Sequence, residues 1–392
     1  MNEETSQFIS DNINADVHQL ALQSNRFPLV DMSLAMRQIN GKQKIKAKVP
    51  LFFDNDEILY PLQLSLEQSS SESTARYKSS LCEGNIFVDL TGGFGVDCCF
   101  IAAHFTHAIY VERQAELCNL AKHNFNVLNQ YNIEVIQAES EKYLKEMNHV
   151  DWIFVDPVRR SESGKKVVLL ADCEPNVFAL SSLLLEKATN VMIKLSPMLD
   201  LTAAISQLPN TTEIHVISIE NECKEILFIL NQNTTINHKI KTINITKSKI
   251  SQYFEFDIDE SKNTSIAYTS TLEKYLYEPN ASIMKSGAFK IIADRFGIRK
   301  LHTSTHLYTS NKLLLQFPGR IFDVIKTWNN SKSELKELSN QVQKANITTR
   351  NYPISVNELR KKLRIKEGGD IYLFACTLAN EMKAIIECVK YT

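Results

Sequence analysis

The 392-residue chain is long enough for two to three domains, and its 44% hydrophobic and 23% charged content is ordinary for a soluble globular protein. No apolar stretch approaches the roughly 20 residues of a membrane span, and the polar N-terminus is unlike a signal peptide, so we expect a cytoplasmic protein. The eight cysteines form no CxxC pair and have no histidine at ligand spacing, which disfavours a zinc site or a disulfide framework.

The net charge of −1 is unevenly distributed along the chain. Residues 1–280 contain 25 Lys and Arg against 36 Asp and Glu, whereas residues 281–392 contain 19 against 9. A basic end favours an anionic partner, with nucleic acid first, although a solvated charged surface would have the same composition.

The N-terminal 50 residues carry apolar side chains at helical spacing. Asp31 is a candidate N-cap for a helix over 32–39, which Asn40-Gly41 would stop. Residues 51–64 are predicted to be irregular or a short strand. Four alternate lysines fit a solvated linker slightly better than a phosphate-contacting patch: Lys42, Lys44, Lys46 and Lys48.

Residues 65–81 are rich in serine, and Ser71–Thr74 can cap a helix that follows. A polar run in this place could close over a ligand bound by the next strand. A plain Ser-rich loop with a helix cap explains the same residues.

From residue 86 onward, strands and helices alternate. The pattern predicts strands at 86–90, 108–112, 133–138, 152–156 and 191–195, and helices at 96–104, 114–128, 140–147, 176–187 and 200–207. Segments 213–220 and 225–230 are joined too closely for a crossover helix and should form an antiparallel hairpin. The prediction is an α/β, Rossmann-like, doubly wound parallel sheet with one reversed strand, ending in this hairpin.

The remainder of the chain predicts smaller α+β structure. We expect an extended connection with strands over 231–280, short strands and helix over 281–328, and a polar helix at 331–344. A helix over 354–366 is capped by Ser355, and a Gly368-Gly369 turn leads into a strand over 370–376 and a terminal helix over 378–388. There is no internal repeat.

The stretch IFVDLTGGFG at 86–95 is the candidate ligand loop. A strand ends at Asp89 and is followed by Gly92, Gly93 and Gly95, then by a helix. Glycine allows backbone to approach a ligand closely or to adopt positive φ, and the helix start offers free N–H groups. The same glycines could form a plain turn, so the residues beyond the loop decide between the two.

Two further acids lie at predicted strand ends. Glu112 follows the loop by about 20 residues, where an acid can bind both hydroxyls of a cofactor ribose. Glu139 follows the third strand, where it can contact an adenine, and Asp89 can hold an amino group. NAD and S-adenosylmethionine both fit, but the spacing D-x-x-G-G-x-G and the terminal hairpin favour S-adenosylmethionine.

The order of the motifs DLTGGFGVD, VE, QAE, DPVRR and NECKEILFIL resembles the class I S-adenosylmethionine-dependent methyltransferases. The stretches SLEQSSSESTARYK, FVDLTGGFGVD with FVDPVRR, and RKKLRIKEGGDIYLFA resemble a bacterial family of these enzymes with a ferredoxin-like insert and a C-terminal THUMP-like domain. The resemblance runs over nearly the whole chain. It implies a helical region at 1–80, a methyltransferase domain at 81–235, a ferredoxin-like domain with its connection at 236–325 and a basic THUMP-like domain at 326–392.

The resemblance also implies roles for individual residues. Asp89, Gly92, Gly93 and Gly95 would hold the methionine part of the cofactor, with Glu112 on the ribose and Glu139 at the adenine. Gln68 and Ser71 resemble the segment that flanks the methionine carboxylate in related RNA methyltransferases.

Asp156 and Pro157 end the fourth strand, where these enzymes place catalytic residues. Amino-methyltransferases typically have Asn/Asp/Ser-Pro-Pro-aromatic here, and Val158 and Arg159 replace the second proline and the aromatic. Arg159 and Arg160 could bind a phosphate, or pair with Asp172 or Glu174.

Lys194 ends the fifth predicted strand, in the sequence Lys-Leu-Ser-Pro. We expect it to line the wall of the site or to contact the substrate, and less readily to be catalytic. Cys98 and Cys99 begin the helix after the glycine loop, and we expect them to be buried rather than nucleophilic.

The sequence therefore predicts an S-adenosylmethionine-dependent methyltransferase, without a metal, that methylates a base nitrogen in tRNA or rRNA. The predicted RNA contacts are the cations of 285–300 and Arg360, Lys361, Lys362, Arg364 and Lys366. The alternatives are a methyltransferase of small molecules or proteins, a non-catalytic RNA-binding protein, and a nicotinamide-dependent oxidoreductase, which the loop spacing supports poorly.

Overall fold

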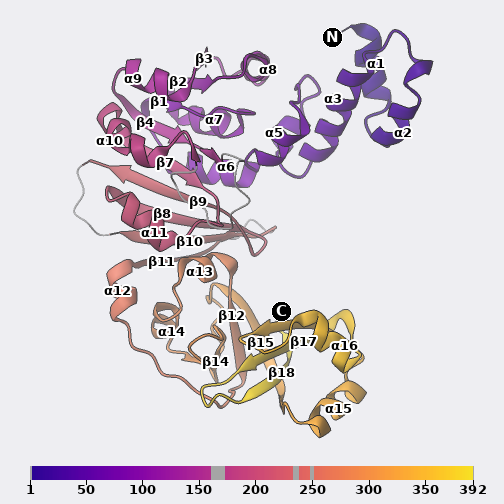
Figure 1. The fold of residues 1–392 in the computed structure, drawn as a ribbon, viewed down its shortest axis with the longest axis vertical. Helices are drawn as coiled ribbons and strands as arrows, with labels where there is room; N and C mark the ends of the chain where they lie inside the picture. The colour runs from indigo at the N-terminus through magenta and orange to yellow at the C-terminus, as the bar shows by residue number, and fades with distance from the viewer. Residues whose placement is uncertain (1, 160–172, 233–237, 248–250, 392) are drawn as a thin grey trace. The chain divides into compact units, whose positions relative to one another are not determined.

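The computed structural model describes residues 2–159, 173–232, 238–247 and 251–391 (Figure 1). The chain divides into two compact units. Unit 1 contains residues 1–212 and 227–236, and unit 2 contains residues 213–226 and 237–392.

The N-terminal part of unit 1 is helical, as the sequence predicts. The side chains of Asn2, Asp16 and Asp31 accept backbone N–H bonds and cap the first three α-helices. A small apolar cluster holds these helices together and contains Phe8, Leu20, Ala35 and Ile39. The elements are α1 (Glu3–Asp11), α2 (Val17–Leu22), the 3₁₀ turn η1 (Ser24–Arg26), α3 (Met32–Ile45), α4 (Pro50–Phe53), α5 (Gln63–Gln68) and α6 (Glu72–Ser79).

Helix α3 is longer than predicted, and the expected stop at Asn40-Gly41 is wrong. A Cβ on Gly41 would lie 2.4 Å from Cβ of Tyr60, so a glycine within the helix lets Tyr60 pack closely against it. Residues 51–64 were predicted to be irregular or a short strand; residues 54–62 are irregular, but residues 50–53 form the short helix α4 and no strand is present between 51 and 64.

The lysines after Gly41 do not form a linker. Lys42 pairs with Asp56, and Lys44 lies 3.2 Å from a carboxylate oxygen of Glu67. The Lys48 ammonium donates to the carbonyls of Leu66 and Glu67 at 2.6 and 2.9 Å. Lys44 and Lys48 therefore fasten α5, whose last carbonyls have no partner within the helix.

The larger sheet has nine strands among the described residues, in the order β11-β10-β8-β9-β7-β4-β1-β2-β3. Strand β1 pairs in parallel with both β2 and β4, and Val88 lies opposite Ile109 and Ile153. Its strands are β1 (Gly84–Asp89), β2 (Phe105–Glu112), β3 (Ile133–Gln137), β4 (Val150–Val155), β7 (Ala188–Leu195), β8 (Thr211–Ile219), β9 (Glu222–Asn231), β10 (Lys239–Ile245) and β11 (Ser251–Asp257).

Helices connect the parallel strands, which confirms the predicted Rossmann-like α/β class. Phe87 and Val88 are completely buried, as expected for a strand covered on both faces. The carboxyl ends of β1, β2, β3 and β4 meet at one edge of the sheet. The connecting elements are α7 (Val96–Ile101), η2 (Ala102–His104), α8 (Ala115–Val127), α9 (Ser140–Glu146), α10 (Val177–Lys187) and α11 (Leu201–Gln207).

The predicted hairpin is present as β8 and β9. Its two turn residues, Glu220 and Asn221, have φ of 49° and 65°, as a tight hairpin turn requires. The hairpin does not end the sheet, however. Strand β10 pairs in parallel with β8, and β11 runs antiparallel to β10, so the sheet extends beyond the predicted edge.

A second, smaller sheet has seven described strands in the order β13-β14-β12-β15-β18-β17-β16. Helices α15 and α16 contribute to the apolar cluster around Trp328. The elements after the large sheet are α12 (Ile258–Asn263), β12 (Tyr275–Pro279), α13 (Ala281–Ser286), α14 (Ile291–Phe296), β13 (Arg299–Lys300), β14 (Tyr308–Ser310), β15 (Gly319–Asn329), α15 (Lys332–Gln341), β16 (Lys344–Arg350), α16 (Val356–Leu363), β17 (Lys366–Thr377) and β18 (Lys383–Lys390).

The predicted terminal helix over 378–388 is wrong. Strand β18 occupies this place and pairs antiparallel with both β15 and β17. Ile385 and Ile386 are both completely buried, and a short run buried on two faces has no periodicity that separates strand from helix. Gly368 and Gly369 lie inside β17 rather than before it, with φ of 96° and 81°.

All eight cysteines are free thiols, and all but Cys223 are buried. Burial raises the pKa of Cys99 and of Cys376 to about 12. Across the described ranges, none of the helices has both the length and the apolar character that crossing a membrane requires.

Candidate active site

A cavity of about 640 Å³ opens in unit 1 at the carboxyl ends of β1, β2 and β4. The structure brings together there most of the residues that the sequence singled out. Its lining includes Gln68, Asp89, residues 91–95, Glu112, Glu139 and Asp156.

The glycine loop is shaped by the ring of Tyr110 on β2. The Tyr110 hydroxyl donates to the Gly93 carbonyl at 2.6 Å, and a Cβ on Gly92 would lie 2.2 Å from the same ring. Gly93 and Gly95 have φ of 54° and 82°. The loop thus needs glycine for close packing and for positive φ, and its backbone faces the cavity without side chains in the way.

Glu112 is held by the loop. It is 9% exposed, its Oε2 accepts from the Gly93 N–H at 3.1 Å, and its Oε1 accepts from the Gln114 N–H at 2.9 Å. A carboxylate has about four acceptor positions, so Glu112 can accept hydroxyl donors from a ligand as well.

Asp89 is the most deeply buried acid of the lining, at 1% exposure. It accepts from the Thr91 N–H at 2.9 Å. Burial raises its pKa to about 8 against the opposing effect of that N–H, and the charges of Asp97, Asp156 and Glu112 raise it further. Asp89 is therefore suited to a cationic ligand group, which would favour its ionised form.

Of the residues predicted to flank the cofactor before β1, one lines the cavity and the other caps a helix. Gln68, at the end of α5, lines the cavity, together with Ser69 and Ser70. Ser71 lies outside the lining, because its hydroxyl accepts from the Thr74 N–H at 3.3 Å and caps α6. The predicted Ser71 is thus a helix cap, whereas its neighbours Ser69 and Ser70 line the cavity.

Asp156 follows β4 directly and lines the cavity, with Pro157 next to it. Its N–H donates to the Thr91 hydroxyl at 2.7 Å, and its Oδ2 accepts from the Lys194 ammonium at 2.5 Å. Lys194 comes from the end of β7, and its side chain is 12% exposed. Its contact with Asp156 brings it next to the lining, and its predicted role as a wall or substrate contact stays a prediction.

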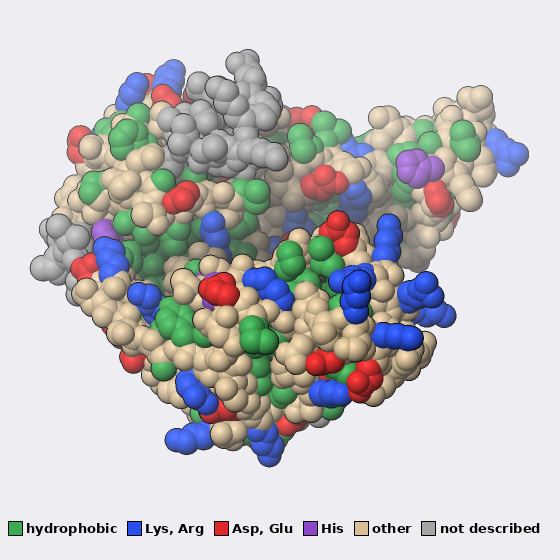
Figure 2. All heavy atoms as spheres, turned by 60° about the horizontal axis from the view of Figure 1, so that its bottom comes forward, with side chains coloured by type: hydrophobic (Ala, Val, Ile, Leu, Met, Phe, Trp, Pro, Cys, Tyr) green, Lys and Arg blue, Asp and Glu red, His purple; other side chains and the backbone are tan. Residues whose placement is uncertain are grey.

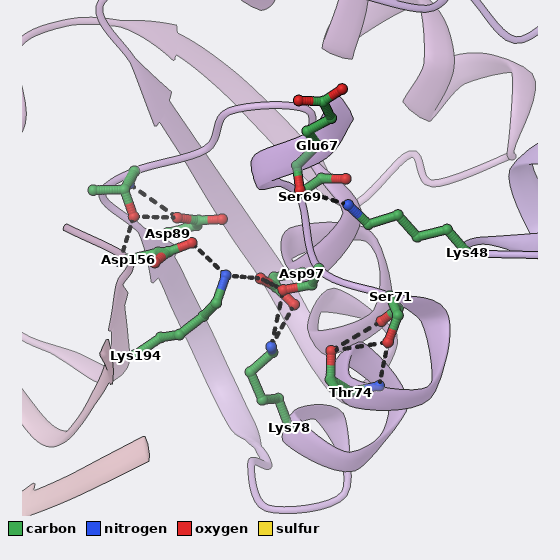
Figure 3. A network of polar contacts seen from close by, with 12 residues as sticks. Lys48, Glu67, Ser69, Ser71, Thr74, Lys78, Asp89, Asp97, Asp156 and Lys194 are labelled. Atoms are coloured by element: carbon green, nitrogen blue, oxygen red, sulfur yellow. Dashed lines mark hydrogen bonds and ion pairs between the residues drawn. The ribbon is translucent and has the colours of Figure 1, made fainter. Parts of the chain in front are cut away.

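A buried ionic network continues from this pair (Figure 3). Asp97 Oδ2 lies 3.9 Å from the Lys194 ammonium, and Asp97 Oδ1 lies 3.0 Å from the ammonium of Lys78, whose side chain is completely buried. The Ser70 hydroxyl donates to Asp97 at 2.6 Å and accepts from Lys78 at 3.0 Å. Burial alone would raise the pKa of Asp97, but both lysines and Ser70 outweigh it and lower the pKa.

Sequence reasoning missed Lys78 and Asp97. One signal was present for Asp97, which is the only charged residue in the otherwise apolar stretch that became α7. A charged residue inside a fully buried helix needs a buried partner.

The segment after Asp156 is described only in part. Val158 is 47% exposed and lines the cavity, and it forms with Arg159 the strand β5 (Val158–Arg159), which pairs with β6 (Cys173–Glu174). Glu174 pairs with Arg113 at 2.8 Å. Arg160 and Asp172 lie outside the described residues, so the predicted partners of the two arginines stay predictions.

One solved structure is similar to this chain over nearly its whole length. A protein from Porphyromonas gingivalis W83, whose crystal structure is described as that of a putative methyltransferase, is 34% identical; the match covers 99% of this chain and 98% of that one, with a TM-score of 0.90. The profile of a ferredoxin-like domain matches residues 275–318, and that of a THUMP domain-like family matches residues 319–390. The chain belongs to this methyltransferase family.

More distant structures match only part of the chain. A methyltransferase-like protein from Streptococcus mutans, solved with SAH, is 14% identical over 41% of this chain and 96% of that one, with a TM-score of 0.31. TrmK from M. capricolum, also solved with SAH, is 11% identical over 41% of this chain and 68% of that one, with a TM-score of 0.33. No curated protein matches the chain.

The predicted RNA contacts of the THUMP-like domain lie on and after α16. Ser355 and Glu358 form a capping box that starts this helix. Lys361, Lys362, Arg364 and Lys366 are exposed. Arg360 is less available, since its guanidinium lies 3.8 Å from Glu367 and its side chain is 19% exposed.

The cations of residues 285–300, which were also predicted to contact RNA, are less available than those of residues 361–366. Lys300 is only 2% exposed and donates to the His302 carbonyl at 2.9 Å, and burial lowers its pKa to about 8, so the prediction that it contacts RNA is wrong. Arg295 and Arg299 pair with Glu260 and Glu273. Lys290 is exposed.

Unit 2 also contains a cavity of about 940 Å³. Its lining includes the cations Lys247, Arg320 and Lys390. Arg320 shares the buried Glu278 with Arg350, so two guanidinium groups face one carboxylate and leave an excess positive charge. Figure 2 shows Lys and Arg side chains scattered over the face that it presents, with several near its right-hand edge.

Among the residues that the structure describes, no group of three or more His, Cys, Asp and Glu side chains lies in an arrangement suited to a metal ion.

Proposed function

We propose that this protein is an S-adenosylmethionine-dependent methyltransferase that acts on RNA. The observation that carries the proposal is that Asp89, Glu112 and Glu139, from the ends of three neighbouring strands, line one cavity beside the glycine loop. Ligands of open α/β sheets bind outside the carboxyl ends of the strands, and a volume of about 640 Å³ suits a nucleoside cofactor.

The residues present fit S-adenosylmethionine. Asp89 would bind its ammonium group, Glu112 its ribose hydroxyls and Glu139 its adenine. When bound, this cofactor supplies an electrophilic methyl group. A nicotinamide cofactor is less well supported, because the loop follows the spacing D-x-x-G-G-x-G rather than G-x-G-x-x-G.

Asp156 and Pro157 would orient the acceptor nitrogen. The carboxylate and the backbone carbonyl accept hydrogen bonds from the target amine, which directs the nitrogen lone pair and contributes through orientation. Val158 and Arg159 stand where related enzymes have a second proline and an aromatic residue, so stacking of the target base has to come from another residue.

The proposal of an RNA substrate rests on the THUMP-like match and on the exposed cations of residues 361–366. The three cations that line the cavity of unit 2 are further candidate phosphate contacts. Such contacts would make binding sensitive to salt, because each neutralised phosphate releases counterions.

The test uses purified full-length protein, labelled S-adenosylmethionine and total RNA from a strain that lacks the gene. We expect label in RNA with the native protein and a loss of about a hundredfold with Asp156→Ala. Glu112→Ala should weaken cofactor binding measured by calorimetry. The matched control is Glu116→Ala, on the exposed side of α8, where the carboxylate pairs with Arg37 at the surface.

Two outcomes would favour the alternatives. Cofactor binding with label in protein or small molecules, but none in RNA, would replace RNA as the substrate. RNA binding without any cofactor binding would contradict the enzyme proposal and support a non-catalytic RNA-binding protein.

A further inference from the structure

We infer that Lys194 is a positioning residue for Asp156, and that Asp97 and Lys78 hold Lys194 in place as one buried chain of alternating charges. This inference rests on the proposed function in one respect only, namely that Asp156 receives the acceptor amine.

The chain of charges is built from four elements of unit 1. Lys78 comes from α6, Asp97 from the first turn of α7, Lys194 from the end of β7, and Asp156 from the segment after β4. Figure 3 shows the Lys194 side chain pointing between Asp156 and Asp97, with Lys78 on the far side of Asp97. The successive nitrogen–oxygen distances are 3.0, 3.9 and 2.5 Å.

Burial makes each link depend on the next. The side chains of Lys78, Asp97 and Lys194 are 0%, 9% and 12% exposed, whereas that of Asp156 is 34% exposed at the cavity. A buried charge is tolerated only when it is paired, so Asp97 requires Lys78, and Lys194 requires its two carboxylates. The chain of charges therefore fixes the geometry of its two members that line the cavity, Asp97 and Asp156.

Charge explains why a lysine is needed at this point. Asp89 of β1 lies within the field of three other acids, Asp97 of α7, Glu112 of β2 and Asp156. Among the described side chains, Lys194 is a cation in contact with Asp156, and Lys78 balances Asp97. Without Lys194, the Asp156 carboxylate would lose the contact that fixes its orientation beside the cavity.

Position separates this role from catalysis. Lys194 is 12% exposed against 34% for Asp156 and donates to Oδ2 of Asp156, so we assign its effect on the reacting groups to that carboxylate. Ser70 joins the same network through Asp97 and also lines the cavity. The segment that borders the cofactor and the acid that receives the substrate are thus tied to the same buried pair.

The experiment compares Lys194→Met and Lys194→Arg with the native protein in single-turnover methylation of RNA. With Lys194→Met we expect a roughly tenfold to hundredfold lower rate at saturating cofactor, with cofactor affinity unchanged within about twofold. Lys194→Arg should restore most of the rate, because it keeps a cation beside Asp156. The matched control is Lys187→Met, which removes a lysine of the same unit that donates to the Met147 carbonyl away from the cavity.

A second readout keeps this inference separate from the proposed function. Carbon-13 labelling of aspartate carboxyls, with Asp156→Asn to assign the signal, reports the surroundings of the Asp156 carboxylate directly. An Asp156 signal that is displaced in Lys194→Met and returns towards its native position in Lys194→Arg supports the inference, even if no RNA is methylated and the proposed function fails.

An Asp156 carboxyl signal that does not move in Lys194→Met would overturn the inference. So would a rate loss that Lys194→Arg does not restore, because restoration by another cation separates the contact with Asp156 from a loss of packing. If Lys194→Met does not fold, Lys194→Gln keeps the hydrogen bond, removes the charge and is read in the same way.

Discussion

Asp89 holds its proton more tightly than an ordinary carboxyl, because burial and three neighbouring acids raise its pKa to about 8. At pH 7 the group is therefore mostly neutral in the protein without ligand. This state reduces the repulsion among the acids of the cavity, and it leaves a carboxyl that can ionise when a cation arrives.

If the cofactor ammonium binds at Asp89, cofactor binding should release a proton. Below pH 8 the carboxyl must ionise first, so affinity should rise by up to about tenfold per pH unit from pH 6 and level off above pH 8. Calorimetry in two buffers with different ionisation enthalpies measures the released proton. Asp89→Asn should abolish the pH dependence, and a native protein that releases no proton would contradict the assignment.

Lys78 should contribute strongly to stability, since Lys78→Met leaves Asp97 buried without its nearest cation. We expect a loss of about 3–5 kcal/mol in the free energy of unfolding at pH 7. The loss should shrink at pH 5. In the native protein, the lowered pKa of Asp97 contributes stability that is present above about pH 4 and is lost as the pH falls further. In the variant, Asp97 accepts a proton more readily, and protonation removes the cost of burying its unpaired charge.

Urea unfolding at the two pH values measures this effect. Lys44→Met is the control, because Lys44 and Glu67 form an exposed pair whose loss should cost less than about 1 kcal/mol. An equal effect of the two substitutions would show that the buried network adds nothing to stability.

At the scale of elements, the site is an assembly of strand ends and of the turns that follow them. The loop after β1 keeps its shape because Tyr110, on the neighbouring strand β2, fills the space that a side chain at position 92 would need. The glycine and the tyrosine therefore act as a pair across two adjacent strands.

Gly92→Ala should cost about 1–3 kcal/mol, because the new methyl group overlaps the Tyr110 ring. The same substitution should cost much less in a Tyr110→Ala background, and a double-mutant cycle of unfolding free energies measures the difference. Gly287→Ala has no neighbour within 4 Å of its Cβ and should show no coupling to Tyr110. Additive effects at Gly92 and Tyr110 would contradict the steric account.

The sequence predicted these elements unevenly, and the physical reason differs in each case. The alternation from β1 to β9 was accessible, because buried parallel strands are continuous apolar runs that helices separate. Strand β18 was predicted to be a helix. Its apolar run is buried on both faces, so it shows neither the two-residue period of a half-buried strand nor the 3.6-residue period of an amphipathic helix. The end of α3 was misplaced because Gly41 serves close packing against Tyr60, which lies well beyond the span that local rules consider.

The candidate site, too, could be predicted only in part, because contacts between distant elements are not visible in the sequence. Asp89, Glu112 and Asp156 were found because strand ends are visible in the sequence. Lys78 and Lys194 could not be joined through Asp97, since their meeting depends on how α6, α7 and β7 pack. Ser71 was preferred to Ser70 because a serine that caps a helix and a serine that faces a cavity look alike in sequence.

At the scale of the whole molecule, the charged residues that we propose for cofactor binding and for RNA binding lie in different parts of the chain. The acids of the cavity lie in unit 1, and the exposed cations of residues 361–366 lie in unit 2. A positively charged cofactor and a negatively charged polymer would thus be bound by different parts of the chain.

Cofactor binding and RNA binding should therefore be separable by mutation. The triple variant Lys361→Ala, Lys362→Ala and Lys366→Ala should weaken RNA binding and reduce the slope of log K against log salt by about 0.7–0.9 for each phosphate that the variant no longer neutralises. Cofactor affinity should not change. Lys332→Ala with Lys336→Ala, on exposed positions of α15, is the control and should leave the slope intact. An unaltered slope in the triple variant would move the RNA-binding surface elsewhere.

The rates at which the buried thiols are alkylated can report how often the structure around them opens. A thiolate reacts with alkylating agents, and burial suppresses it at Cys98 and Cys99 in unit 1 and at Cys376 and Cys388 in unit 2. Each thiol should then be alkylated only as often as the structure around it opens. Mass spectrometry of the alkylated peptides over time would measure how often each unit opens, and whether a bound cofactor slows unit 1 alone, without any engineered label.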